Sequence, residues 1–225
     1  MTPSSRGKAF PFFQSFAERT SQQPEQKELI VIKNENKRGA SIFLGGAFAI
    51  LCALTAVAQT PTITFRNTIT GEVLNFNDAL PEGRDSDGVK QFLATGRNPY
   101  NEDVSCLKAG EQIFLSACSG CHGHVGEGKI GPGLNESYWT YTQNETDEGF
   151  FSTIFGGAQA SMGPQYQNLT LDEMLRVMAW VRHLFKEEPE KAVWYTPEQR
   201  KKFKPYAGHE TFPDDPPGMC KSKAK

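Results

Sequence analysis

The spacing of apolar residues predicts that the second half of the chain is mainly helical. Apolar positions recur every three to four residues after Ser105, the expected N-cap of a first helix, at Ala109, Ile113, Phe114 and Ala117. A capping box of Thr170 and Glu173 predicts the start of a second long helix. Its apolar face comprises Met174, Leu175, Val177, Met178, Val181 and Leu184. Shorter helices are expected at residues 88–94, 147–155 and 197–202.

The segments on either side of this helical region are predicted to be irregular. Alternating residues at 62–66 and 73–76 flank the turn pair Thr70-Gly71 and predict a short β-hairpin. Residues 186–225 contain six prolines, which disfavour long regular elements. We therefore expect a mainly α fold, with a helical domain at 105–186 between an N-terminal extension at 59–104 and a C-terminal extension at 187–225.

Residues 42–58 have the pattern of a secretory signal peptide. The uncharged stretch Ile42–Val57 follows Lys37 and Arg38 and ends in Ala-Val-Ala, which predicts cleavage after Ala58. An uncleaved membrane anchor is the alternative, but this stretch is shorter than the ~20 residues that a spanning helix prefers. A lipoprotein cysteine at Cys52 is disfavoured by the bulky residue before it. Residues 1–41 are interpreted as a disordered leader or as the result of a start codon placed too far upstream.

Cleavage after Ala58 would leave an acidic protein. Residues 1–58 hold seven of the 24 Lys and Arg and four of the 26 Asp and Glu, which leaves 17 against 22, a net charge of −5. This balance argues against nucleic acid as a partner and favours a partner with a basic docking face. The membrane is expected to be involved only during export, and the mature protein is expected in the periplasm.

Cys118-Ser-Gly-Cys121-His122 has the spacing of a covalent haem motif. Two thiols three residues apart reach the two vinyl groups of one porphyrin, and the adjacent histidine then lies beneath the iron as a ligand. A zinc site would need four ligands, and only His124 is near. A redox-active cysteine pair normally begins a helix after a strand, whereas this pair ends a predicted helix. The motif therefore predicts one covalently bound haem c.

Two later segments are candidates to complete the iron site. The run Gly131-Pro132-Gly133-Leu134 offers a backbone carbonyl for the imidazole nitrogen that does not bind iron, with a simple turn as the alternative. Met162 is the candidate sixth ligand, because a thioether on a loop can cross to the opposite haem face and raises the reduction potential. The remaining candidates are assigned to the core (Met174, Met178), the surface or packing (His183, His209), the C-terminal tail (Met219), or a position too close to the motif (His124).

Trp139 and the two remaining cysteines have structural roles in this interpretation. Trp139, with Tyr138 and Tyr141, is expected to line the haem, and the Trp139 N–H or a tyrosine hydroxyl to reach a propionate, although ordinary core packing is the alternative. Cys106 and Cys220 are left over once Cys52 and the haem motif are assigned. In an oxidising compartment they are expected to form a disulfide, with two separate thiols as the alternative.

Residues 109–185 resemble a class I cytochrome c domain. Gly110 and Phe114, the haem motif, Gly131-Pro-Gly-Leu, Ser161-Met-Gly-Pro and Trp180 occur in that family's order. The runs at 128–141, 153–158 and 168–175 are similar to the cytochrome cL family, and the likeness covers most of residues 62–207. It implies three to five helices around one covalent haem.

The resemblance also implies an electron-transfer protein and not an enzyme. The expected donor is a quinoprotein methanol dehydrogenase, and the expected acceptor is a smaller cytochrome c. Glu145, Asp147 and Glu148 are candidate docking residues, with a plain solvated face as the alternative. Two other functions stay open: a haem subunit of a membrane-bound dehydrogenase complex, and a haem enzyme such as a peroxidase. The last is disfavoured by Met162 in the sixth position and by the lack of a second CxxCH motif.

Overall fold

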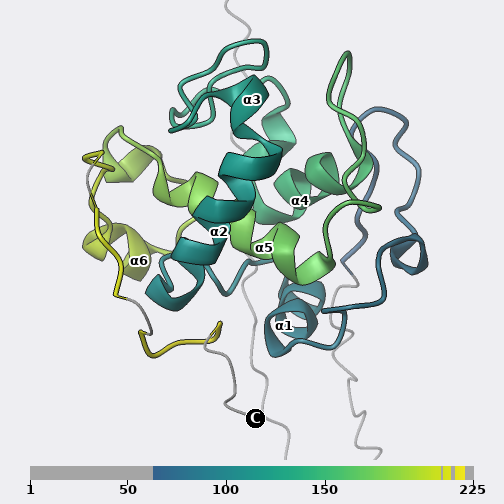
Figure 1. The fold of residues 1–225 in the computed structure, drawn as a ribbon, viewed down its shortest axis with the longest axis horizontal. Helices are drawn as coiled ribbons and strands as arrows, with labels where there is room; N and C mark the ends of the chain where they lie inside the picture. Colours follow the sequence, from purple (N-terminus) through teal and green to yellow (C-terminus); the bar gives the residue numbers. More distant parts are fainter. Residues whose placement is uncertain (1–62, 209, 214–215, 221–225) are drawn as a thin grey trace, which may run out of the picture. The chain divides into compact units, whose positions relative to one another are not determined.

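The structure, a computed structural model, describes residues 63–208, 210–213 and 216–220 (Figure 1). The leader, the signal segment with its cleavage site, and His209 lie outside this part of the chain. The described residues form α-helices and short 3-10 helices and contain no sheet: η1 (Phe76–Asp78), α1 (Asp87–Thr95), α2 (Val104–Ala117), α3 (Ser119–His122), η2 (Thr142–Glu145), α4 (Asp147–Gly156), α5 (Leu171–His183), η3 (Pro189–Lys191) and α6 (Pro197–Lys202). None of these helices is long and apolar enough to cross a membrane.

The helices predicted from the sequence are present, and two local predictions need correction. The capping box of Thr170 and Glu173 starts α5 as expected. Asp103, not Ser105, is the N-cap of α2, because its carboxylate accepts from both the backbone N–H and the hydroxyl of Ser105. The β-hairpin is not confirmed. Arg66 and Val73 form a single isolated bridge, which is too short to be a ladder.

Helices α2 and α5 cross at the centre of the described fold (Figure 1). Gly110 on α2 permits this crossing. A Cβ atom at this position would overlap the backbone carbonyl of Arg176 and would lie 3.1 Å from Trp180 Cβ, both on α5. The two helices therefore pack with their backbones in close contact at Gly110.

The N-terminal extension packs through aromatic rings onto α4. Phe65 has its ring centroid 5.2 Å from that of Phe92 on α1 and 5.7 Å from that of Phe151 on α4. Phe76 meets the rings of Phe151 and Phe155 at 5.9 and 5.4 Å. These contacts pack the extension onto α4, the helix whose Phe150 and Ile154 line the cavity described below.

The C-terminal extension is tied to the beginning of α2 by a disulfide. Cys106 and Cys220 are bonded, with their Cα atoms 5.0 Å apart. Two hydrogen bonds accompany it: Met219 N–H donates to Asp103 Oδ2 at 2.8 Å, and Cys220 N–H donates to Ser105 Oγ at 3.0 Å. The N-cap of α2 and residues 219–220 therefore form one local structure.

Removing this disulfide is expected to destabilise the protein without changing its haem site. The double substitution Cys106→Ala and Cys220→Ala opens a link between residues 114 positions apart, and we expect the free energy of unfolding to fall by about 2–4 kcal/mol. Denaturant unfolding of the holoprotein measures this loss. The visible spectrum should stay unchanged, because neither cysteine lines the cavity described below. Unfolding at the same denaturant concentration as the parent would contradict the prediction.

Candidate functional site

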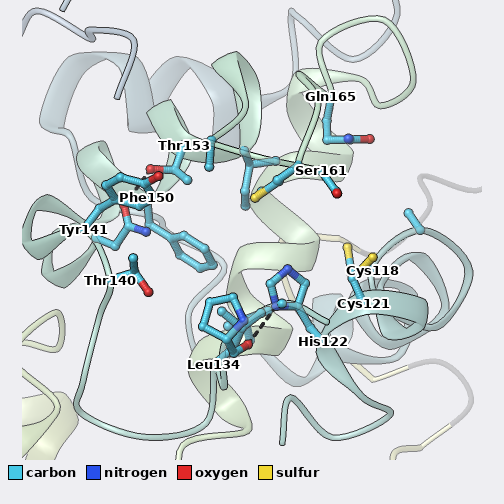
Figure 2. Close-up of a pocket in the computed structure, with 18 of the residues that line it drawn as sticks. Cys118, Cys121, His122, Leu134, Thr140, Tyr141, Phe150, Thr153, Ser161 and Gln165 are labelled. Carbon is cyan, nitrogen blue, oxygen red and sulfur yellow. Dashed lines mark hydrogen bonds between the residues drawn. The ribbon is translucent and has the colours of Figure 1, made fainter. Parts of the chain in front are cut away.

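The two cysteines of the haem motif are brought together by a short turn at the end of α2. Cys118 caps α2, and α3 then places Cys121 and His122 one turn later, with both backbone N–H groups donating to the Cys118 carbonyl. Figure 2 shows the two thiols next to each other and beside the His122 ring. Burial, followed by the charge of Cys121, raises the pKa of the Cys118 thiol to about 11. Redox-active pairs have the opposite shift, so this arrangement does not fit thiol exchange.

The orientation of His122 is fixed by the loop that follows it. Its Nδ1 atom lies 2.9 Å from the carbonyl oxygen of Pro132, which can only accept a hydrogen bond, so Nδ1 carries the proton (Figure 2). The Nε2 lone pair is therefore available to a metal. A Cβ atom at Gly131 would lie 2.7 Å from His122 Cε1, so this position admits only glycine if the ring is to stay in place. Backbone hydrogen bonds from Gly131 to Cys121 and from Gly128 to His122 hold the loop against the motif.

A cavity of about 400 Å³ lies beside the motif. Its lining includes every residue that the sequence singles out for cofactor binding: Cys118, Cys121, His122, Pro132, Leu134, Trp139 and Met162. The apolar part of its wall also includes Phe114 from α2, Phe150 and Ile154 from α4, and Val177 from α5. Residues of α2, α4 and α5 therefore all contribute to the wall of the cavity.

Met162 reaches this cavity from an exposed loop. The methionine loop, residues 157–164, follows α4, and Met162 is half-buried while Ser161 and Gly163 are exposed. Figure 2 shows Ser161 on the other side of the pocket from His122. Met174 and Met178 are fully buried in α5 and do not line the cavity. Of the three, only Met162 is placed where its thioether can face a bound cofactor.

The residues that line the cavity fit a covalently bound haem. The thiols, the free Nε2 of His122 and a thioether are the donors that haem c uses. Trp139 adds a further observation, because its Nε1 atom is buried and has no acceptor among the described residues. A buried indole N–H normally has a partner, and a haem propionate is a suitable one.

Behind the cavity wall lies a buried ion pair that the sequence interpretation missed. Arg182 on α5 is fully buried, and its Nε donates to Asp147 Oδ1 at 3.2 Å. Its Nη2 donates to the carbonyl oxygens of Asn144 and Thr146 at 2.7 and 3.1 Å. Burial lowers the pKa of the guanidinium, and Asp147 opposes that shift. The sequence did indicate that Arg182 is buried, because Arg182 lies four residues after Met178 and therefore on the apolar face of α5.

The expectation that Asp147 belongs to an exposed acidic docking group is wrong. Asp147 is buried, and besides Arg182 it accepts hydrogen bonds at 2.9 Å from the backbone N–H of Asn98 and from Asn101 Nδ2. Glu148 is half-buried, and burial raises its pKa. Glu145 alone of the three is exposed. The three acidic residues therefore do not form one exposed group, because Asp147 belongs to the core and Glu145 to the surface.

The comparisons with known proteins agree with this site. Residues 106–181 match the family model described as cytochrome c oxidase, cbb3-type, subunit III. The chain is 52% identical over 174 residues to cytochrome c-L of Methylorubrum extorquens, which covers 75% of this chain and 88% of that protein. The chain belongs to the cytochrome cL family.

Solved structures of the cytochrome cL family resemble the fold described above. The crystal structure of cytochrome cL from the marine methylotroph Methylophaga aminisulfidivorans is 51% identical, with a TM-score of 0.62 over 66% of this chain and 98% of that one. Cytochrome cL from Hyphomicrobium denitrificans is 56% identical, with a TM-score of 0.60 over 65% of this chain and 88% of that one. The predicted class I cytochrome c fold is confirmed.

Membership of the cytochrome cL family fixes the cofactor and the class of function. The chain is a c-type cytochrome with covalently bound haem c, and it takes part in electron transport as a carrier and not as an enzyme. Haem iron supplies one-electron redox chemistry. The protein supplies the attachment, the axial ligands, the apolar surroundings and the surface through which partners approach.

Proposed function

We propose that this chain is a periplasmic cytochrome that accepts single electrons from a PQQ-dependent methanol dehydrogenase and passes them to a smaller cytochrome c. The observation that carries the proposal is the identity of 52% with cytochrome c-L over 174 residues. This match is longer than the helical region 105–186, so it includes sequence from the extensions as well as the haem-binding core. A likeness of that extent supports a shared partner as well as a shared cofactor.

The residues of the cavity have separate roles in this proposal. Cys118 and Cys121 would attach the haem through thioethers, His122 Nε2 and the Met162 thioether would bind its iron, and the Pro132 carbonyl orients the imidazole. Leu134 and the other apolar wall residues exclude water, which limits the reorganisation that accompanies each change of charge. The Trp139 indole N–H binds a propionate.

Electrons are proposed to enter and leave where the cavity meets the surface. Cys121 is exposed, and Ile130, on the loop after the motif, lines the cavity and is 81% exposed. Among the described residues, Ile130 is the most exposed of the large apolar side chains. It provides an apolar contact for a partner, close to the bound cofactor, where electron transfer is fastest because tunnelling falls steeply with distance.

Replacing Ile130 with serine is expected to weaken the docking of the dehydrogenase. The apparent Michaelis constant for the cytochrome should rise by up to about tenfold, because apolar area that is buried on docking is lost. Val73→Ser is the matched control, since Val73 is also β-branched and 60% exposed but does not line the cavity. The reduction potential should be the same in both variants. Equal Michaelis constants for the two variants would contradict a docking role for Ile130.

Mixing the purified proteins tests the function itself. A methanol-reduced dehydrogenase from the same organism should reduce the ferric cytochrome at a rate that saturates with cytochrome concentration. The measurement belongs at low ionic strength, because screening over ~10 Å at 0.1 M salt weakens attraction between exposed charges. No reduction under these conditions, with an active dehydrogenase, would refute the partner and leave an electron carrier for another donor.

A second function is favoured by the family match at residues 106–181, whose description names a subunit of an oxidase. In that case the chain would be a haem subunit of a membrane-bound complex and would retain the apolar stretch at residues 42–57. Sequencing the amino terminus of the exported protein separates the two possibilities. A terminus at Gln59 supports the periplasmic carrier, and a retained stretch supports the membrane complex.

A further inference from the structure

One side chain from another segment holds the methionine loop in place. The hydroxyl oxygen of Tyr141 accepts a hydrogen bond of 3.1 Å from the backbone N–H of Gln159. Tyr141 is half-buried and lines the cavity together with Gln159 and Met162 (Figure 2). Within the described part of the chain, no other hydrogen bond links residues 158–163 to a segment outside residues 154–165.

The loop itself has little that would hold it in one conformation. The Ala158 N–H donates to the Met162 carbonyl at 2.9 Å, so the loop closes on itself. Closure needs glycine at position 157, where φ is +78° and a Cβ atom would lie 2.8 Å from the Met162 carbonyl oxygen. Ala160 has a left-handed φ of +64°, which is unfavourable for a residue with a Cβ atom. Because Gln159, Ala160 and Ser161 are also exposed, burial contributes little to the closed form.

The segment that contains Tyr141, in contrast, is held in place by hydrogen bonds to α4 and α5. It is the N-cap of η2, and its carbonyl accepts from the N–H of Asn144 at 3.0 Å. Asn144 is buried, and its side chain accepts from Thr153 Oγ1 of α4 at 2.7 Å. The Asn144 carbonyl accepts from Arg182 of α5 at 2.7 Å. Helices α4 and α5 therefore fix the segment from which Tyr141 reaches the loop.

We infer that Tyr141 is a positioning residue that keeps Met162 turned toward the haem iron. The hydrogen bond to Gln159 favours the closed loop over an open loop in which Met162 has left the cavity. The inference rests on the proposed assignment of Met162 as the axial ligand. It does not depend on which protein donates electrons.

This role has a measurable consequence for small ligands that compete for the iron. Imidazole binds ferric haem only in molecules whose Met162 has left, so its apparent affinity is its intrinsic affinity multiplied by the fraction of open loops. Tyr141→Phe keeps the ring and removes the acceptor. The open fraction, and with it the apparent affinity for imidazole, should rise about threefold to tenfold.

A different role for the Tyr141 hydroxyl would give a different result. If its hydrogen mainly served a haem propionate, Tyr141→Phe would change the reduction potential and leave the affinity for imidazole unchanged. A purely structural role would lower the unfolding temperature and leave both quantities unchanged. Either of these results would overturn the inference.

The experiment is an imidazole titration of the exported holoprotein in its ferric form, followed by the change in its visible spectrum. Tyr138→Phe is the matched control, because Tyr138 lies three residues away, is 71% exposed and does not line the cavity. The parent and Tyr138→Phe should bind imidazole equally, and Tyr141→Phe more tightly. Equal binding by all three proteins would refute the role of Tyr141.

The titration separates this inference from the proposed function. It uses no dehydrogenase, so a failure to exchange electrons with methanol dehydrogenase leaves its outcome unaffected. The weak far-red band of Met-ligated ferric haem must be present in the parent and in Tyr141→Phe before imidazole is added. Its absence from the parent would overturn the Met162 assignment and the inference together.

Discussion

Replacing Met162 with alanine is expected to abolish the far-red band of the ferric protein and to lower its reduction potential. A thioether stabilises ferrous iron more than ferric iron, so its loss should lower the potential by on the order of 0.1 V or more. The haem should remain attached, because Cys118 and Cys121 do not depend on Met162. Acid-acetone extraction and the mass of the protein test the attachment, and a spectroscopic redox titration measures the potential.

The matched control is Met174→Leu, a conservative change at a fully buried methionine of α5. It keeps the side-chain volume and should cost less than about 1.5 kcal/mol of stability while leaving the band and the potential unchanged. If Met174→Leu removed the band and Met162→Ala did not, the ligand assignment would be wrong. Such a result would require α5 to move, since Met174 does not line the cavity.

The part of the site that the sequence predicted depends on local geometry. Thiols three residues apart on one turn must lie close together, and the adjacent histidine must follow them. The approach of Pro132 to His122 is also short-range, since a loop of only ten residues joins them. The long helices were predictable for the same reason, because periodicity and capping are properties of neighbouring residues.

The part that the sequence did not predict depends on contacts between distant segments. Asp147 stands in the first turn of α4, where acidic residues are common on solvated helix ends. Asp147 is buried because it pairs with Arg182, which lies 35 residues later. No sequence pattern near Asp147 indicates this partner. The hydrogen bond from Gln159 to Tyr141 could not be predicted for the same reason, because it joins two segments 18 residues apart. For the N-cap of α2, the sequence pattern indicated Ser105, whereas the structure has Asp103 two residues earlier in this role.

Arg182 contacts both the core of the fold and residues that line the cavity. Its guanidinium carbon lies 5.0, 4.9 and 4.2 Å from the ring centroids of Trp139, Phe150 and Trp194. Trp139 and Phe150 line the cavity, so one arginine supports two residues of its wall. Nη1 of the guanidinium has no hydrogen-bond acceptor among the described residues, and the three rings contact the group as cation–π partners.

The substitution Arg182→Met is expected to lower the free energy of unfolding by about 3–5 kcal/mol. It leaves the Asp147 carboxylate buried with two neutral donors and without its positive partner. Arg176→Met is the matched control on the same helix. Arg176 also pairs with a buried aspartate, Asp172, at 2.6 Å, but Arg176 is partly exposed and Tyr100 also donates to Asp172, so its loss should cost less, about 1–2 kcal/mol. Denaturant unfolding of the two holoproteins gives both values.

A second substitution tests whether the uncompensated charge causes the loss. Asp147→Asn keeps an acceptor for Asn98 and Asn101 and removes the negative charge. The double variant Asp147→Asn and Arg182→Met should therefore be more stable than Arg182→Met alone, by about 1 kcal/mol or more, because no unpaired charge stays buried. If the double variant were less stable than Arg182→Met, the ring contacts and carbonyl bonds of Arg182 would account for its contribution. In that case the pairing with Asp147 would be incidental to stability.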